Sequence, residues 1–118
     1  MQTTIDDAYR FAKGEVIKHP GRFDIRLDGP PLDFYSVTDH GEYMGIVPAM
    51  ASPGTALSET PIAQSIFGAD ATDPRASFTQ IGLTVVSGEE IDEIFDRAHM
   101  NSVWANTVAV TEKHNQPG

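Results

Sequence analysis

The stretch from Ser77 to Thr111 constrains the fold most, because its hydrophobic pattern changes period twice. From Ser77 to Val86 the pattern is typical of a strand, because Ile81, Leu83 and Val85 alternate with polar or small residues and Phe78 and Val86 add bulk on the second face. Ser87-Gly88-Glu89-Glu90 has the spacing of a capping box, and a helix over residues 89–98 is expected to follow it. Residues 103–111 are apolar on both faces, as in a central or covered strand. We expect strand, helix and strand in succession.

The first part of the chain predicts one more helix and three more strands. Thr4 is a good N-cap for a helix that we expect to continue to Lys18, with Gly14 as an alternative end. Strands are expected at 22–28, 32–38 and 42–47. The predicted fold is α+β, a mainly antiparallel sheet of about five strands with two helices in the order α-β-β-β-arm-β-α-β. At 118 residues, the chain 1–118 is expected to form a single small domain.

Residues 48–76 stand apart from this pattern, because they are rich in Pro, Ala, Ser and Thr. A loop of this length inside a compact domain is uncommon and usually functional. Thr60-Pro61 as a helix start and Gly68 as a stop predict a short helix within it. We interpret 48–76 as a long arm that contacts neighbouring subunits, and 112–118 as a flexible tail. The expected apolar anchors on the arm are Ile62, Ile66 and Phe67.

Charge and composition exclude several classes of protein. The formal net charge is −9, and only eight Lys and Arg are scattered along the chain, so we expect no direct nucleic-acid binding. The chain has no Cys, which rules out disulfides and thiolate metal sites. The acidic N-terminus has no apolar segment typical of a signal peptide, and no apolar run is long enough to span a membrane. We therefore expect a soluble protein, cytoplasmic or part of a particle.

Few residues are candidates for chemistry. His40 has Asp39 beside it as an orienting carboxylate, but both belong to the turn expected between two strands. Asp92, Asp96 and His99 share one face of the expected helix, as in half of a di-metal motif. A second copy of that motif is missing from the sequence, so a solvated acidic face is the preferred interpretation. We expect no cofactor and no metal, with His40, Asp39 and His99 only as weak catalytic candidates.

Three functions remain open at this point. The preferred one is a non-enzymatic assembly protein, a small structural or oligomeric component of a phage or other particle, whose partners are copies of itself or other assembly subunits. A small enzyme or ligand-binding domain is an alternative, with the arm as a lid and His40 or His99 as the acid–base group. The other alternative is an inhibitor or immunity-type protein that docks helix 89–98 on a basic partner. The residues expected at interfaces, besides the arm anchors, are Trp104, Glu89, Asp92, Glu93 and Asp96.

Overall fold

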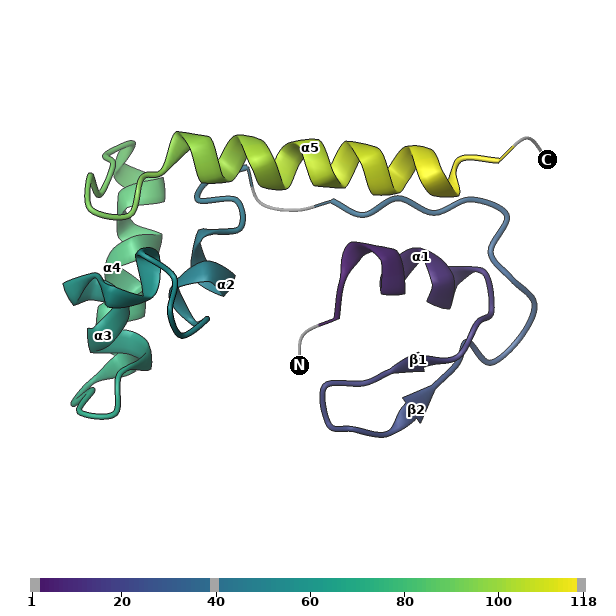
Figure 1. Cartoon of the computed structure of the whole chain (residues 1–118), viewed down its shortest axis with the longest axis horizontal. Coiled ribbons are helices and arrows are strands. Elements are labelled where there is room, and N and C mark those ends of the chain that lie inside the picture. Colours follow the sequence, from purple (N-terminus) through teal and green to yellow (C-terminus); the bar gives the residue numbers. More distant parts are fainter. Residues whose placement is uncertain (1–2, 39–40, 117–118) are drawn as a thin grey trace. The chain divides into compact units, whose positions relative to one another are not determined.

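The computed structural model describes residues 3–38 and 41–116, and most of its regular structure is helical (Figure 1). Its elements are α1 (Ile5–Ala12), β1 (Ile17–Lys18), β2 (Asp24–Ile25), α2 (Ile46–Met50), the 3-10 helix η1 (Leu57–Glu59), α3 (Pro61–Phe67), α4 (Pro74–Ser87) and α5 (Arg97–His114). The chain divides into two compact units. The N-terminal unit comprises Met1–Asp39 and Ala105–Gly118, and the central unit comprises His40–Trp104.

The predicted five-stranded α+β fold is wrong. In the described part of the chain, the sheet consists of β1 and β2 alone, paired antiparallel with Ile17 opposite Ile25 and Lys18 opposite Asp24. Of the expected strand 22–28, only β2 forms. Residues 32–38 carry no regular element, and 42–47 lead through turns into α2. Most side chains of 22–28 and 32–38 are exposed, so their alternation does not mark a face buried in a sheet, whereas 42–47 brings Tyr43 and Ile46 into the core of the central unit.

The strand, helix and strand expected between residues 77 and 111 are in fact two helices and a loop. Asp73 caps α4, since its side chain accepts a hydrogen bond from the backbone N–H of Ala76 at 2.9 Å. Pro74 occupies the first helical position, and Gly88 ends the helix with a φ of 73°. The expected capping box fails because Ser87 is the last residue of α4. Asp96 instead caps α5, accepting from the N–H of His99 at 2.9 Å.

The segment 48–76, predicted to be an arm, carries the end of α2, η1, α3 and the start of α4. Its short helix is confirmed, because α3 begins after the N-cap Thr60 with a proline in the first turn and ends at Gly68. The segment also contributes to the hydrophobic core of the central unit, and the expectation of a long arm within the fold is therefore wrong. Core residues supplied by this segment are Ala49, Met50, Leu57, Ala63 and Ile66.

Tyr43 organises the rest of the core of the central unit. Its φ is 51°, a left-handed conformation that is uncommon for a residue with a Cβ. Thr84 Oγ1 donates its proton to the carbonyl of Ile81, so the Tyr43 hydroxyl donates to Thr84 Oγ1, at 3.1 Å. The same hydroxyl accepts from the N–H of Ile91 at 2.9 Å. One buried side chain thereby connects α4 to the loop that precedes α5, a loop that also buries Ile94 completely.

The N-terminal unit is built on α1 and the last turns of α5. Thr4 and Asp7 form the capping box that starts α1. The helix ends before Gly14, which has a φ of 82°, so continuation to Lys18 is wrong and the alternative end is right. Tyr9, on the buried face of α1, contacts Thr111 through their hydroxyls at 3.2 Å. None of the helices in the described ranges is both long and apolar enough to cross a membrane.

Candidate interaction surface

Helix α4 has one face in the core and one in solvent. Ile81 is its buried residue, and Thr84 lies on the same side, bonded to Tyr43. The other sides of the helix combine large apolar side chains with the exposed polar residues Arg75, Thr79 and Gln80. The Asp-Pro start and the glycine stop determine where the helix begins and ends, but they do not determine which of its faces is buried.

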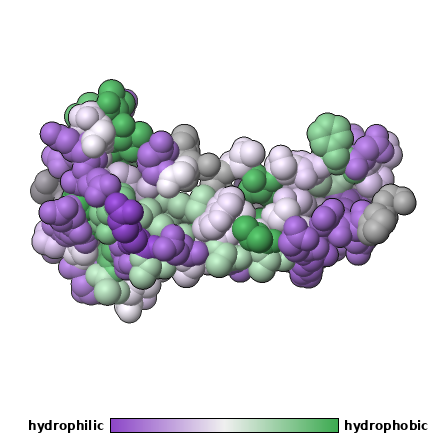
Figure 2. Space-filling view, turned by 90° about the horizontal axis from the view of Figure 1, so that it is seen from above, coloured by the Kyte–Doolittle hydropathy of each residue, from purple (hydrophilic) through white to green (hydrophobic). Residues whose placement is uncertain are grey.

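The outer face of α4 presents large apolar side chains to solvent. Val86 is 86% exposed, Leu83 is 61% exposed and Phe78 is 47% exposed. Figure 2 shows hydrophobic residues gathered on the surface of the part of the molecule that carries α4. Single exposed apolar residues are normal, but several on one helix form a patch, which makes this face a candidate interaction surface. We call Phe78, Leu83, Val85 and Val86 the outer apolar face of α4.

The anchors expected on the arm are only partly available. Ile66 is buried in the core, and Ile62 is half-buried against it. Phe67, at the end of α3, is exposed. Trp104 is 57% exposed, as an interface anchor would be, but it lies on the helix α5 and not on a strand. The outer apolar face of α4 was missed because a strand over 77–86 would have buried these residues.

The acidic residues expected to dock on a basic partner lie in a loop and not on a helix. Glu93 accepts a hydrogen bond from the N–H of Ile62, in the first turn of α3, at 2.9 Å. Asp96 caps α5, and Glu89 accepts a long hydrogen bond of 3.4 Å from Ser87 Oγ. Asp92 is exposed. Two of these four carboxylates therefore satisfy helix N-termini, where a negative charge is favourable.

Of the candidate acid–base residues, the structure describes His99 alone. Asp39 and His40 lie outside the described residues. His99 Nε2 donates to the carbonyl oxygen of Gly45 at 3.1 Å, which ties the first turn of α5 to the start of α2. This contact gives His99 a structural role. No group of three or more His, Asp or Glu that could hold a metal ion occurs in residues 3–38 and 41–116.

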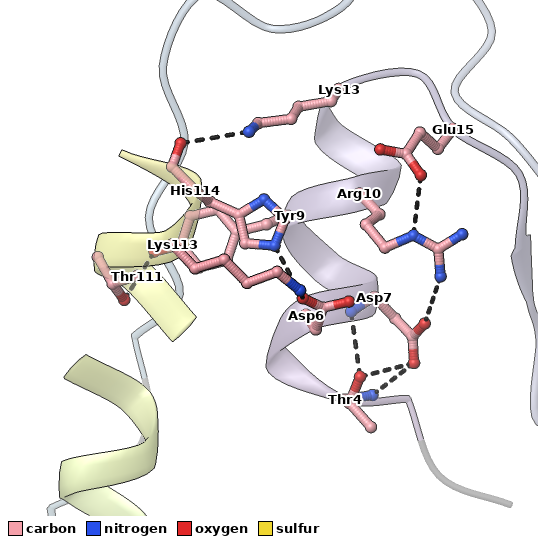
Figure 3. A network of polar contacts seen from close by, with 10 residues as sticks. All are labelled: Thr4, Asp6, Asp7, Tyr9, Arg10, Lys13, Glu15, Thr111, Lys113 and His114. Atoms are coloured by element: carbon pink, nitrogen blue, oxygen red, sulfur yellow. Dashed lines mark hydrogen bonds and ion pairs between the residues drawn. The ribbon is translucent and has the colours of Figure 1, made fainter. Parts of the chain in front are cut away.

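A polar network connects α1 to the end of α5 (Figure 3). Asp6 Oδ1 accepts from Lys113 Nζ at 2.6 Å and from His114 Nε2 at 2.9 Å. The imidazole of His114 stacks on the ring of Tyr9, with centroids 5.1 Å apart. Lys13 Nζ donates to the carbonyl oxygen of His114 at 3.2 Å, so a cation satisfies the C-terminal end of α5.

The same network shifts the pKa of its carboxylates. Hydrogen bonds from Lys113, and then from His114, lower the pKa of Asp6 from 3.8 to about 2. Hydrogen bonds from Thr4 lower the pKa of Asp7. On the other side of α1, Glu15 raises the pKa of Arg10 through a hydrogen bond of 2.8 Å. All of these shifts favour the charged forms, so they stabilise the helix and its contacts instead of preparing a group for proton transfer.

A cavity of about 220 Å³ lies beside this network, within the N-terminal unit. Tyr9, Tyr35 and Asp33 are among its lining residues. Lys13 and His114, which also line it, are already engaged in the contacts described above. The cavity has room for a few small groups, but its strongest donors serve to hold α5 against α1.

Comparison with known proteins places the chain in a family. A family model described as "Protein of unknown function (DUF3604)" matches residues 1–118, so the chain belongs to this family. Neither the curated proteins nor the solved structures contain a match to the chain.

Proposed function

We propose that this chain is a non-enzymatic interaction protein that assembles with copies of itself or with neighbouring subunits through the outer face of α4. The observation that carries the proposal is the exposure of Phe78, Leu83 and Val86 on one helix. Fully burying such a side chain is worth about 1.5–3 kcal/mol. A partner that covers this face would therefore gain enough free energy to offset part of the cost of association.

The proposed contact surface is the outer face of α4 and not residues 48–76, where the sequence predicted it. Of the three anchors expected on residues 48–76, Ile66 is in the core and Phe67 is exposed. The outer face of α4 follows directly after that segment and offers more apolar surface. The acidic loop supports an inhibitor less well, because Glu93 and Asp96 cap helices and would lose those contacts on docking.

The experiment that tests the proposal is a native-mass measurement by light scattering over a series of protein concentrations. The full chain is compared with a variant carrying Leu83→Ser and Val86→Ser, both of which leave the buried Ile81 in place. A matched control is Val108→Ser, which removes an exposed valine from α5. We expect a discrete assembly for the full chain and the control, and a lower mass for the double variant. An assembly that the double variant retains would contradict the proposal.

A further inference from the structure

Gly82 lies in the middle of α4 without a local reason to be glycine. A Cβ added there would meet no heavy atom within 4 Å, so packing inside the central unit does not require its absence. Its φ is not in the left-handed region, so the backbone does not require glycine either. Glycine in a helix interior costs about 1 kcal/mol relative to alanine. A small residue at an exposed position of a helix permits the close approach of a second backbone.

Two members of the outer apolar face of α4, Phe78 and Val86, are placed symmetrically about Gly82. Residues three and four positions apart share a face of a helix, as do residues seven apart. Phe78 and Val86 lie four positions on either side of Gly82, and Thr79 and Val85 lie three positions on either side. An antiparallel copy of the same helix, crossing at Gly82, would place each Phe78 against a Val86 of the other copy. Such a contact is isologous, because each copy uses the same patch.

Opposite charges stand at the two ends of α4. Arg75 lies in the first turn of the helix, seven positions before Gly82, and Glu89 follows Gly88, the residue that ends the helix. Both side chains are exposed, and neither forms an ion pair with another residue in the described part of the chain. Helix α4 contains no Asp or Glu, although the whole chain has a net charge of −9. A contact between copies at this face thus avoids the repulsion expected elsewhere on the surface.

We propose that the partner of the outer face of α4 is a second copy of this chain, in a two-fold symmetric dimer whose α4 helices run antiparallel and cross at Gly82. This inference rests on the proposed function and specifies its partner. The 14-residue helix is about 21 Å long, so the apolar pairs lie near the two-fold axis and the charges near the ends. Arg75 of each copy pairs with Glu89 of the other, and two ion pairs flank an apolar centre.

Charge reversal tests the antiparallel pairing directly. Arg75→Glu alone, or Glu89→Arg alone, places like charges together at both ends of the dimer. Each is expected to raise the dimer dissociation constant roughly tenfold, measured by sedimentation of the full chain. The double variant Arg75→Glu with Glu89→Arg restores opposite charges and is expected to recover dimerisation. Single reversals without effect, or a double variant that is not rescued, would overturn the proposed geometry.

A larger side chain at residue 82 tests whether the two helices cross there. Gly82→Leu adds a side chain at the axis in both copies and is expected to weaken the dimer at least about tenfold, because the helices can no longer approach closely. Gln80→Leu is the matched control, since it adds a leucine at an exposed position outside the symmetric face. Helix content by circular dichroism verifies that both variants fold. A dimer unaffected by Gly82→Leu would overturn the crossing.

Different results would contradict the interaction surface and the antiparallel dimer. An assembly that is lost with Leu83→Ser and Val86→Ser but indifferent to charge reversal and to Gly82→Leu refutes the antiparallel dimer and keeps the interaction surface. A chain that stays monomeric at every concentration refutes both the antiparallel dimer and assembly with copies of itself.

Discussion

Replacing Gly45 with alanine is expected to destabilise the central unit. Gly45 is the N-cap of α2 and has a φ of 72°, a region that disfavours residues with a Cβ. A Cβ placed there would lie 2.5 Å from Cγ2 of Val103, on α5. The loop is also held in place, because the carbonyl of Gly45 accepts a hydrogen bond from His99. The added methyl group therefore meets both backbone strain and a steric clash.

The two contributions have known sizes. A left-handed conformation costs a residue with a Cβ about 1–2 kcal/mol. Overpacking a well-packed site typically costs about 1–3 kcal/mol. Together they predict a loss of about 2–5 kcal/mol, a large share of the ~5–15 kcal/mol by which a typical domain is stable.

Urea unfolding followed by the fluorescence of Trp104, the single tryptophan, measures this loss. Gly54→Ala is the matched control, because Gly54 has a φ of 86° but a Cβ there would meet nothing within 4 Å. It should lose only the backbone contribution of about 1–2 kcal/mol. Adding Val103→Ala to Gly45→Ala should recover part of the clash. Equal losses for Gly45→Ala and Gly54→Ala would refute the contact between α2 and α5.

Three further predictions concern the core, the acidic loop and the N-terminal unit. Ile94 is completely buried, so truncating its side chain should lower the free energy of unfolding measured in urea. The expected loss is about 1 kcal/mol for Ile94→Val and about 2–5 kcal/mol for Ile94→Ala. A neutral Ile94→Ala would mean that the loop does not pack as described. Glu93→Ala should cost about 1 kcal/mol because it removes a cap of α3, whereas Asp92→Ala should be neutral; equal effects would argue against capping. The folded-state pKa of Asp6 is about 2, below its ordinary 3.8, so its stabilising effect is present above about pH 4 and is lost as the pH falls toward 2. Asp6→Asn should therefore weaken the pH dependence of thermal unfolding in that window, and an unchanged dependence would refute the contact with α5.

The exposure of the outer apolar face of α4 was not predicted, because it depends on the type of element that carries these residues. A strand over 77–86 would have placed Leu83 with Ile81 and Val85 on one face and Phe78 with Val86 on the other. On α4 these side chains point to solvent, except that of Ile81, which is the buried residue. The signal that could have revealed the helix is local, namely Asp73-Pro74 as its start and Gly88 as its stop. The arrangement of Phe78 and Val86 about Gly82 depends on helical spacing, so it does not exist in a strand.

The sequence by itself determined the features that depend on neighbouring residues. The Thr4 cap and the helix from Thr60 to Gly68 formed as predicted, because a cap needs only a hydroxyl and the N–H groups that follow it. Only the tertiary structure decided which apolar residues are buried. Tyr43 reaches Thr84 and Ile91, which are distant in sequence, and these contacts select helix and loop where local alternation favoured strands. Burial is a property of the whole chain, so a short hydrophobic pattern that fits both a helix and a strand cannot determine it.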